Sequence, residues 1–205
     1  FIPASNTKLF TFYTAYSILG DSLVNGLNYL ERSDSLIFWG TGDPSFLHPD
    51  LKNDQVLEFL KSSGKDLYLL NNFDQVASFG SGWSWDWYNA YYATERSAFP
   101  VFGNVVRFEK AKEELRITVI PERFRTSLSG KDTDDWQGYR FRRDRFSNLF
   151  SYEINEEGLA DSFETDIPFV TSAEMTAIML SELVGKRVEL LKNKDYLGLD
   201  PIKLQ

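Results

Sequence analysis

The chain has 205 residues, a hydrophobic content of 42%, an aromatic content of 16% and a formal net charge of -8. This composition is sufficient for a buried core, and its acidic balance argues against nucleic acid or anionic lipid as a partner, since both attract positive charge. The absence of cysteine excludes disulfides and thiol chemistry, and no apolar run approaches the ~18–20 residues of a membrane span.

The first twenty residues predict an apolar helix, over residues 5–19, with a serine and a lysine on one face. Ser5 and Lys8 are three positions apart, so their side chains can approach each other. A serine beside a lysine can form a nucleophile with its own base. Because Phe10 and Tyr13 widen the apolar face, we expect Lys8 to be desolvated, which would lower its pKa toward the range of a general base.

The same pattern also has a structural interpretation. Ser5 can act as an N-cap hydroxyl that satisfies backbone N–H groups. A second pair at the same spacing, Ser62 and Lys65, spans Gly64, where a helix is expected to end, so neither a shared face nor a buried lysine is expected there. Spacing alone therefore leaves both catalysis and capping open for Ser5.

The next segment predicts a β-α-β unit. Residues 36–39 are expected to form a buried strand that stops at the turn Gly40-Thr41-Gly42-Asp43-Pro44. Asn53 or Asp54 then caps a helix, and a short strand follows over residues 66–70. No lysine-serine pair follows the glycines, so a phosphate loop is rejected.

The centre of the chain, residues 79–104, is rich in aromatic residues and glycine. We expect a structured loop whose rings anchor it to a core, and an aromatic platform for sugar or peptide is the alternative. Residues 105–108 and 115–120 alternate like a hairpin. Residues 139–145, with four arginines, resemble an anion patch in isolation but also fit a strand with one solvated face, which we favour.

Towards the C-terminus, Thr171 and Glu174 form a capping-box pattern for a helix that ends at Gly185, and a strand is expected over residues 188–191. His48 is the only histidine. It lies in a predicted turn, so we expect contact with solvent or backbone rather than a role in a Ser-His-Asp triad.

Several motifs also occur in an order that resembles a known enzyme family. They are Pro3-Ala4-Ser5-Asn6-Thr7-Lys8-Leu9 with Leu19-Gly20, Gly40-Thr41-Gly42-Asp43-Pro44, Gly82-Trp83-Ser84-Trp85-Asp86, and Ser97-Ala98-Phe99-Pro100 with Gly103-Asn104. Together they are similar to the S-x-x-K segment and later landmarks of the class C low-molecular-mass penicillin-binding proteins, the D-alanyl-D-alanine carboxypeptidase/endopeptidase family.

This resemblance implies a serine-type peptidase acting on peptidoglycan stem peptides, in the periplasm or at the cell-envelope exterior. Ser5 would be the nucleophile that forms an acyl-enzyme, and its backbone N–H would help to bind the oxyanion. Lys8 would accept the serine proton. β-Lactams would acylate the same serine, and the resemblance implies no cofactor and no metal.

The resemblance further implies an α+β fold in two parts. Residues 1–25 would be the N-terminal piece of a transpeptidase-like domain with the nucleophile helix, and residues 26–205 an inserted, mixed α/β, strand-rich region, which could form two lobes. The family's S-x-N and K-T-G motifs are absent. Together with an opening at Phe1 rather than Met, their absence leads us to expect a chain that is incomplete or inactive alone.

Two alternatives stay open. One is a non-catalytic module of the cell envelope that keeps the family's inserted domain as an interaction surface. The other is a general α/β binding domain in which Ser5 serves only as a helix cap. The sequence does not distinguish carboxypeptidase from endopeptidase action, and it leaves the oligomeric state open.

Overall fold

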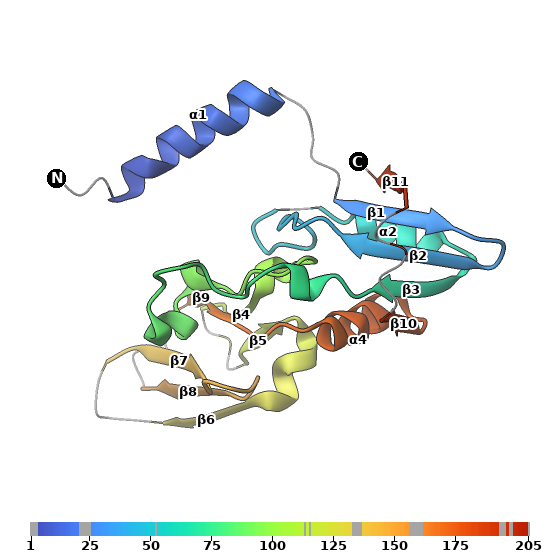
Figure 1. Ribbon diagram of the computed structural model, residues 1–205. Coiled ribbons are helices and arrows are strands. Elements are labelled where there is room, and N and C mark those ends of the chain that lie inside the picture. Colours follow the sequence, from blue (N-terminus) through green and yellow to red (C-terminus); the bar gives the residue numbers. More distant parts are fainter. Residues whose placement is uncertain are drawn as a thin grey trace.

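Figure 1 shows a computed structural model of the chain. The structure describes residues 4–20, 26–51, 53–112, 114, 116–132, 137–155, 162–192, 196 and 199–204. Within these ranges the strands form three sheets, accompanied by helices and short 3-10 turns. The predicted α+β, strand-rich fold is therefore confirmed.

The largest sheet has the strand order β10-β3-β2-β1-β11. Its strands are β1 (Leu27–Glu31), β2 (Ser35–Gly40), β3 (Asp66–Leu70), β10 (Val188–Leu191) and β11 (Ile202–Leu204). Strands β2 and β10 run parallel to β3, whereas β1 is antiparallel to both β2 and β11. The expected strands at residues 36–39, 66–70 and 188–191 are all present.

Two helices pack on this sheet. They are α2 (Gln55–Ser62), which connects β2 to β3, and α4 (Ala173–Val184), which precedes β10. Parallel neighbours require such crossovers, so the predicted β-α-β unit is confirmed. Both helices bury an apolar face in the same core, through Val56, Leu57 and Leu60 of α2 and Ala177, Met179 and Leu180 of α4.

The cap of α4 lies one residue later than predicted. Ser172 is the N-cap, and its hydroxyl accepts a hydrogen bond from the backbone N–H of Met175 at 3.0 Å. Thr171 is instead held by Glu95, to which it donates both its backbone N–H and its hydroxyl. Gly185 ends the helix in the left-handed conformation, as expected.

The remaining strands form two three-stranded sheets within the described residues, ordered β5-β4-β9 and β6-β8-β7. Their bounds are β4 (Val105–Lys110), β5 (Thr118–Ile120), β6 (Leu128–Asp132), β7 (Tyr139–Arg143), β8 (Phe150–Ile154) and β9 (Phe163–Pro168). The antiparallel pair β4-β5 confirms the predicted hairpin. Aromatic rings join the two sheets, because Phe108 stacks on Phe141 at 4.6 Å and meets Phe150 edge to face at 5.5 Å between centroids.

The turn after β2 explains two glycines of the 40–44 motif. A Cβ at Gly40 would lie 2.3 Å from the carbonyl oxygen of Ala98 and 2.6 Å from Cβ of Phe99, so only glycine permits this approach. Gly42 has a φ of 84° and donates its N–H to the Ala98 oxygen at 2.8 Å. The 40–44 and 97–100 landmarks are thus in direct contact.

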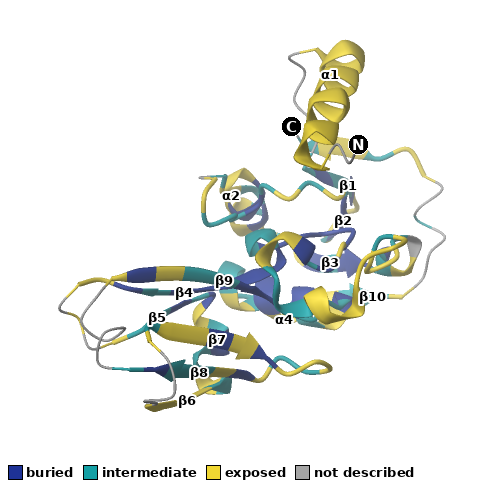
Figure 2. Cartoon of the chain, turned by 90° about the vertical axis from the view of Figure 1, so that its left-hand side faces the viewer, coloured by how far each residue is buried: buried dark blue, intermediate teal, exposed yellow. Residues whose placement is uncertain are grey.

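The first helix, α1 (Thr7–Leu19), follows a 3-10 turn at Ala4–Asn6 and stands away from the sheets (Figure 1). Its existence is confirmed, but the expected burial is wrong. None of its residues is buried, and Phe10 and Tyr13 are 72% and 71% exposed (Figure 2). Apolar side chains occur all around this helix, and no described element covers them.

Candidate functional site

The structure places Ser5 in the 3-10 turn and Lys8 in the first turn of α1. Both are exposed, and no hydrogen bond between these two described side chains is present. The cap position belongs to Asn6, whose side chain makes no capping hydrogen bond. The predicted desolvation of Lys8 is therefore wrong for the chain in this structure, because the apolar face that would surround the lysine is itself exposed.

The second serine-lysine pair behaves as predicted. The Ser62 hydroxyl donates to the carbonyl of Phe59 at 2.9 Å, within its own helix. The Lys65 ammonium donates to the carbonyl of Arg32 at 2.6 Å and lies 3.4 Å from the Glu31 carboxylate. Each side chain thus has a structural partner elsewhere, and the shared spacing has no chemical meaning here.

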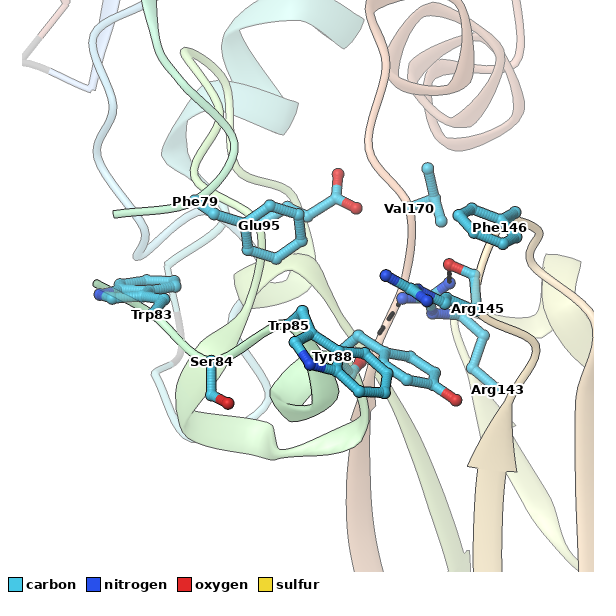
Figure 3. A pocket seen from close by; sticks show the side chains of 10 residues that line it. All are labelled: Phe79, Trp83, Ser84, Trp85, Tyr88, Glu95, Arg143, Arg145, Phe146 and Val170. Carbon is cyan, nitrogen blue, oxygen red and sulfur yellow. Dashed lines mark hydrogen bonds between the residues drawn. The ribbon is translucent and has the colours of Figure 1, made fainter. Parts of the chain in front are cut away.

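A cavity of about 420 Å³ lies between the 79–95 segment and the turn that follows β7 (Figure 3). Its lining residues are Phe79, Trp83, Ser84, Trp85, Tyr88, Glu95, Arg143, Arg145, Phe146 and Val170. The aromatic segment supplies one wall, and the end of β7 with the turn after it supplies Arg143, Arg145 and Phe146 opposite. Segments almost fifty residues apart in sequence therefore meet at this cavity.

The prediction that rings anchor residues 79–104 is confirmed for Phe99, which is 2% exposed and packs against Phe38 and Phe46, and for Phe102, which packs against the same core. Several rings earlier in the segment are not anchors. Trp85 is 70% exposed, and Phe79, Tyr91 and Tyr92 are also exposed. A buried polar residue adds to the anchoring. Asn104 donates its side-chain amide to the carbonyl of Glu95 and to the hydroxyl of Ser97. The rings of Phe79, Trp85, Tyr91 and Tyr92 remain at the surface, as the alternative of an aromatic platform requires.

Arg143 closes the base of the cavity and is only 3% exposed. Its guanidinium donates to the carbonyl oxygens of Pro168 at 2.8 Å and Asp144 at 2.6 Å, and more weakly to those of Ser147 and Tyr88. Burial lowers the pKa of this arginine. These bonds tie β7, β9 and the aromatic segment to one buried cation.

The sequence did contain a signal for this burial. Tyr139, Phe141 and Arg143 share one parity on β7, and Phe141 is buried, whereas Arg140 and Arg142 on the other face are exposed. The predicted strand with one solvated face is therefore confirmed, and Arg143 lies on its buried face. A two-residue period places Arg143 inside with the rings.

Arg145 projects from the turn after β7 and lies over the ring of Trp85. Its guanidinium carbon is 4.6 Å from the Trp85 ring centroid and 5.0 Å from that of Phe146. Arg145 and Phe146 belong to a turn that Asp144 holds. The Asp144 carboxylate accepts hydrogen bonds from the Phe146 backbone N–H at 3.0 Å and the Ser147 hydroxyl at 2.9 Å. These bonds, that from the Phe146 N–H above all, lower the pKa of Asp144.

Glu95 is the buried acid of the cavity. Its Oε2 accepts hydrogen bonds from both the backbone N–H and the hydroxyl of Thr171, at 2.9 and 3.0 Å. Hydrogen bonds of this kind satisfy a buried carboxylate. Glu95 therefore connects the aromatic segment to the start of α4.

A second buried arginine has a structural explanation. Arg107 on β4 forms a two-pronged hydrogen bond with Asp166 on β9, both contacts at 2.8 Å, and further ion pairs with Asp50 and Glu164. The Asp166 carboxylate raises the pKa of Arg107. A perturbed pKa often marks a functional site, but here an ion-pair network that joins two strands accounts for it.

The described residues contain no group of histidine, cysteine, aspartate or glutamate that could hold a metal ion. His48 accepts a hydrogen bond at Nδ1 from the backbone N–H of Asp50, at 3.1 Å, which confirms the predicted backbone contact. None of the helices in the described ranges is long and apolar enough to cross a membrane.

No protein-family model and no curated protein matches this chain. Solved structures do. The chain has the fold of a penicillin-binding protein. Penicillin binding protein 4 from Haemophilus influenzae matches 94% of this chain with a TM-score of 0.61 and 17% identity. A structure of that protein in complex with a β-lactam matches 98% of this chain with a TM-score of 0.52 and 16% identity.

This chain spans about half the length of the solved chains that it matches, 49% and 48% respectively. The resemblance predicted from the ordered motifs is thus confirmed for the fold. At such identities the likeness concerns the fold alone, and the chemistry depends on individual residues.

Proposed function

We propose that this chain is part of a serine-type D-alanyl-D-alanine carboxypeptidase/endopeptidase of the bacterial cell envelope. The observation that carries the proposal is the S-x-x-K pattern of Ser5 and Lys8 at the start of α1, in a chain with the fold of penicillin binding protein 4. Peptidoglycan stem peptides would be the substrates, and the periplasm or envelope exterior the location.

The proposed chemistry is acyl transfer. Lys8 accepts the proton of the Ser5 hydroxyl, and the serine oxygen attacks the carbonyl of the peptide bond between the two D-alanines. The tetrahedral intermediate collapses to an ester on Ser5 and releases the terminal D-alanine as the leaving amine. Water then hydrolyses the ester. A β-lactam would react at the same carbonyl position and remain attached to Ser5.

We further propose that residues 1–25 belong to a transpeptidase-like domain and residues 26–205 to an inserted region. The exposed apolar side chains of α1 support this division, because a helix with that composition is normally covered by a core. Since the sequence has neither S-x-N nor K-T-G, we expect the 205-residue chain alone to be inactive.

An interaction module without catalysis is the second candidate. The observation that favours it is the cavity at residues 79–95 and 143–146, which is formed entirely within the proposed inserted region and needs neither Ser5 nor Lys8. The two candidates differ in one measurable property, namely whether Ser5 is acylated.

The test is intact-mass measurement of the full-length protein that contains this chain, after incubation with a labelled penicillin. We expect one adduct that maps to Ser5, its loss in Ser5→Ala, and acylation slower by about 10²–10⁴ in Lys8→Ala, the usual contribution of a general base. Ser17→Ala, on the same exposed helix, is the matched control and should retain the adduct. A folded full-length protein without an adduct, or an adduct that persists in Ser5→Ala, would refute the catalytic proposal.

A further inference from the structure

We propose that the cavity between residues 79–95 and 143–146 is a binding site for an acidic peptide, separate from Ser5. A carboxylate of the peptide pairs with the guanidinium of Arg145, and an adjoining apolar side chain packs against the exposed parts of the Trp85 and Phe146 rings, beside the guanidinium. The cavity volume of about 420 Å³ fits one or two residues of an extended peptide.

The position of the Arg145 guanidinium is the first observation that supports this site. The contacts of Arg145 with Trp85 and Phe146 are made through ring faces, at 4.6 and 5.0 Å from the centroids. Among the described residues, no acid pairs with its guanidinium and no hydrogen bond engages it. Stacking keeps the planar group oriented while its N–H edges stay available, which is the arrangement that binds a carboxylate with two parallel hydrogen bonds.

The charges around the cavity also favour an anion. The chain as a whole carries a formal charge of -8, yet this cavity has two arginines, Arg143 and Arg145, and one carboxylate, Glu95, in its lining. Glu95 accepts hydrogen bonds from Thr171, and the nearby Asp144 carboxylate accepts hydrogen bonds from Phe146 and Ser147 within its own turn. Of the three charged residues in the lining, Glu95 and Arg143 are buried and Arg145 is exposed, so an incoming ligand meets the charge of Arg145 between aromatic walls.

The aromatic rings decide what accompanies the carboxylate. Trp85 is 70% and Phe146 81% exposed, so both can still gain from covering apolar surface. Exposed tryptophan next to arginine is the composition that carries most binding energy at protein and peptide interfaces. Nucleic acid, which would also use rings and arginine, is disfavoured by the acidic charge of the chain.

The experiment titrates the ¹⁵N-labelled 205-residue chain with two peptides that differ by one charge, acetyl-Ala-Glu-Ala-amide and acetyl-Ala-Gln-Ala-amide. The indole N–H signal of Trp85, assigned by its loss in Trp85→Phe, reports occupancy. We expect saturable shifts with the glutamate peptide and affinity at least about tenfold lower for the glutamine peptide, since a charge-assisted pair is worth that much. Chitotetraose serves as a neutral sugar probe.

Variants separate charge from shape. Arg145→Gln should lower affinity for the glutamate peptide at least about tenfold. Arg145→Lys should give an intermediate loss, because lysine keeps the charge but cannot form the two parallel hydrogen bonds of a guanidinium. Arg142→Gln, an exposed arginine on the opposite face of β7, is the matched control and should bind normally.

Equal affinity for the two peptides, an unchanged affinity in Arg145→Gln, binding of chitotetraose alone, or no binding of any probe would each overturn the proposal. These results are independent of acylation at Ser5. The peptide-binding proposal can therefore be refuted while the peptidase proposal stands, and the peptidase proposal can be refuted while peptide binding stands.

Discussion

Replacing Arg143 by methionine should destabilise the chain substantially, because this one buried side chain satisfies carbonyl groups from three segments. Its two shortest bonds, to Pro168 at 2.8 Å and Asp144 at 2.6 Å, are charge-assisted and together contribute about 3–6 kcal/mol. Removing a buried charge also recovers part of its desolvation cost. The net loss of unfolding free energy should therefore be about 2–4 kcal/mol.

The measurement is urea unfolding of the wild-type chain and Arg143→Met, followed by tryptophan fluorescence and far-UV circular dichroism. The two probes should give the same transition if unfolding is two-state. Arg142→Met, on the solvated face of the same strand, is the control and should change stability by no more than about 0.5 kcal/mol. A loss below about 1 kcal/mol for Arg143→Met would refute the view that this cation holds the region together.

Three further changes test other contacts. Gly40→Ala should cost about 1–3 kcal/mol or abolish folding, since its Cβ would lie 2.6 Å from that of Phe99, and thermal unfolding measures it. Glu95→Ala should lower the free energy of unfolding by about 1–3 kcal/mol, and by more than Glu95→Gln does, because alanine leaves both donors of Thr171 without their acceptor. Equal losses for the two variants would contradict this. The fold lowers the pKa of Asp144, so the hydrogen bonds of its carboxylate stabilise the turn above pH 3.8, the ordinary pKa of an aspartate, and are lost as the pH falls below that value. The Trp85 indole signal should therefore be constant from neutral pH down to about pH 3.8 and shift at lower pH. Asp144→Asn should remove this transition.

The regular elements could be predicted from sequence because their patterns are local. Alternation, helix caps and turn glycines located the strands at residues 36–39, 66–70 and 188–191 and the helices between them. The ordered motifs also indicated the fold, which the similarity to penicillin binding protein 4 confirms. The cap of α4 was misplaced because Thr171 is drawn away by Glu95, a residue seventy-six positions earlier.

Burial was harder to predict than secondary structure, since it depends on which segments meet. The apolar pattern of α1 indicated a covered helix, yet Phe10 and Tyr13 have no described element against them. The rings of residues 79–104 were expected to be anchors, which is true of Phe99, whereas Trp85 and its neighbours are exposed and the buried Asn104 adds hydrogen bonds that hold the segment. The prediction of a strand with one solvated face did not place Arg143, although its parity on β7 indicated the interior.

The two arginines of the cavity show how a structural residue can prepare a binding surface. A continued strand would place Arg143 and Arg145 on the same face, and both would then compete for the interior. The turn held by Asp144 prevents this, because it ends β7 at Arg143 and leads Arg145 out toward Trp85. Burial of the first arginine therefore fixes the backbone from which the second projects. It follows that Arg143→Met should weaken peptide binding as well as stability, whereas Arg145→Gln should affect binding alone.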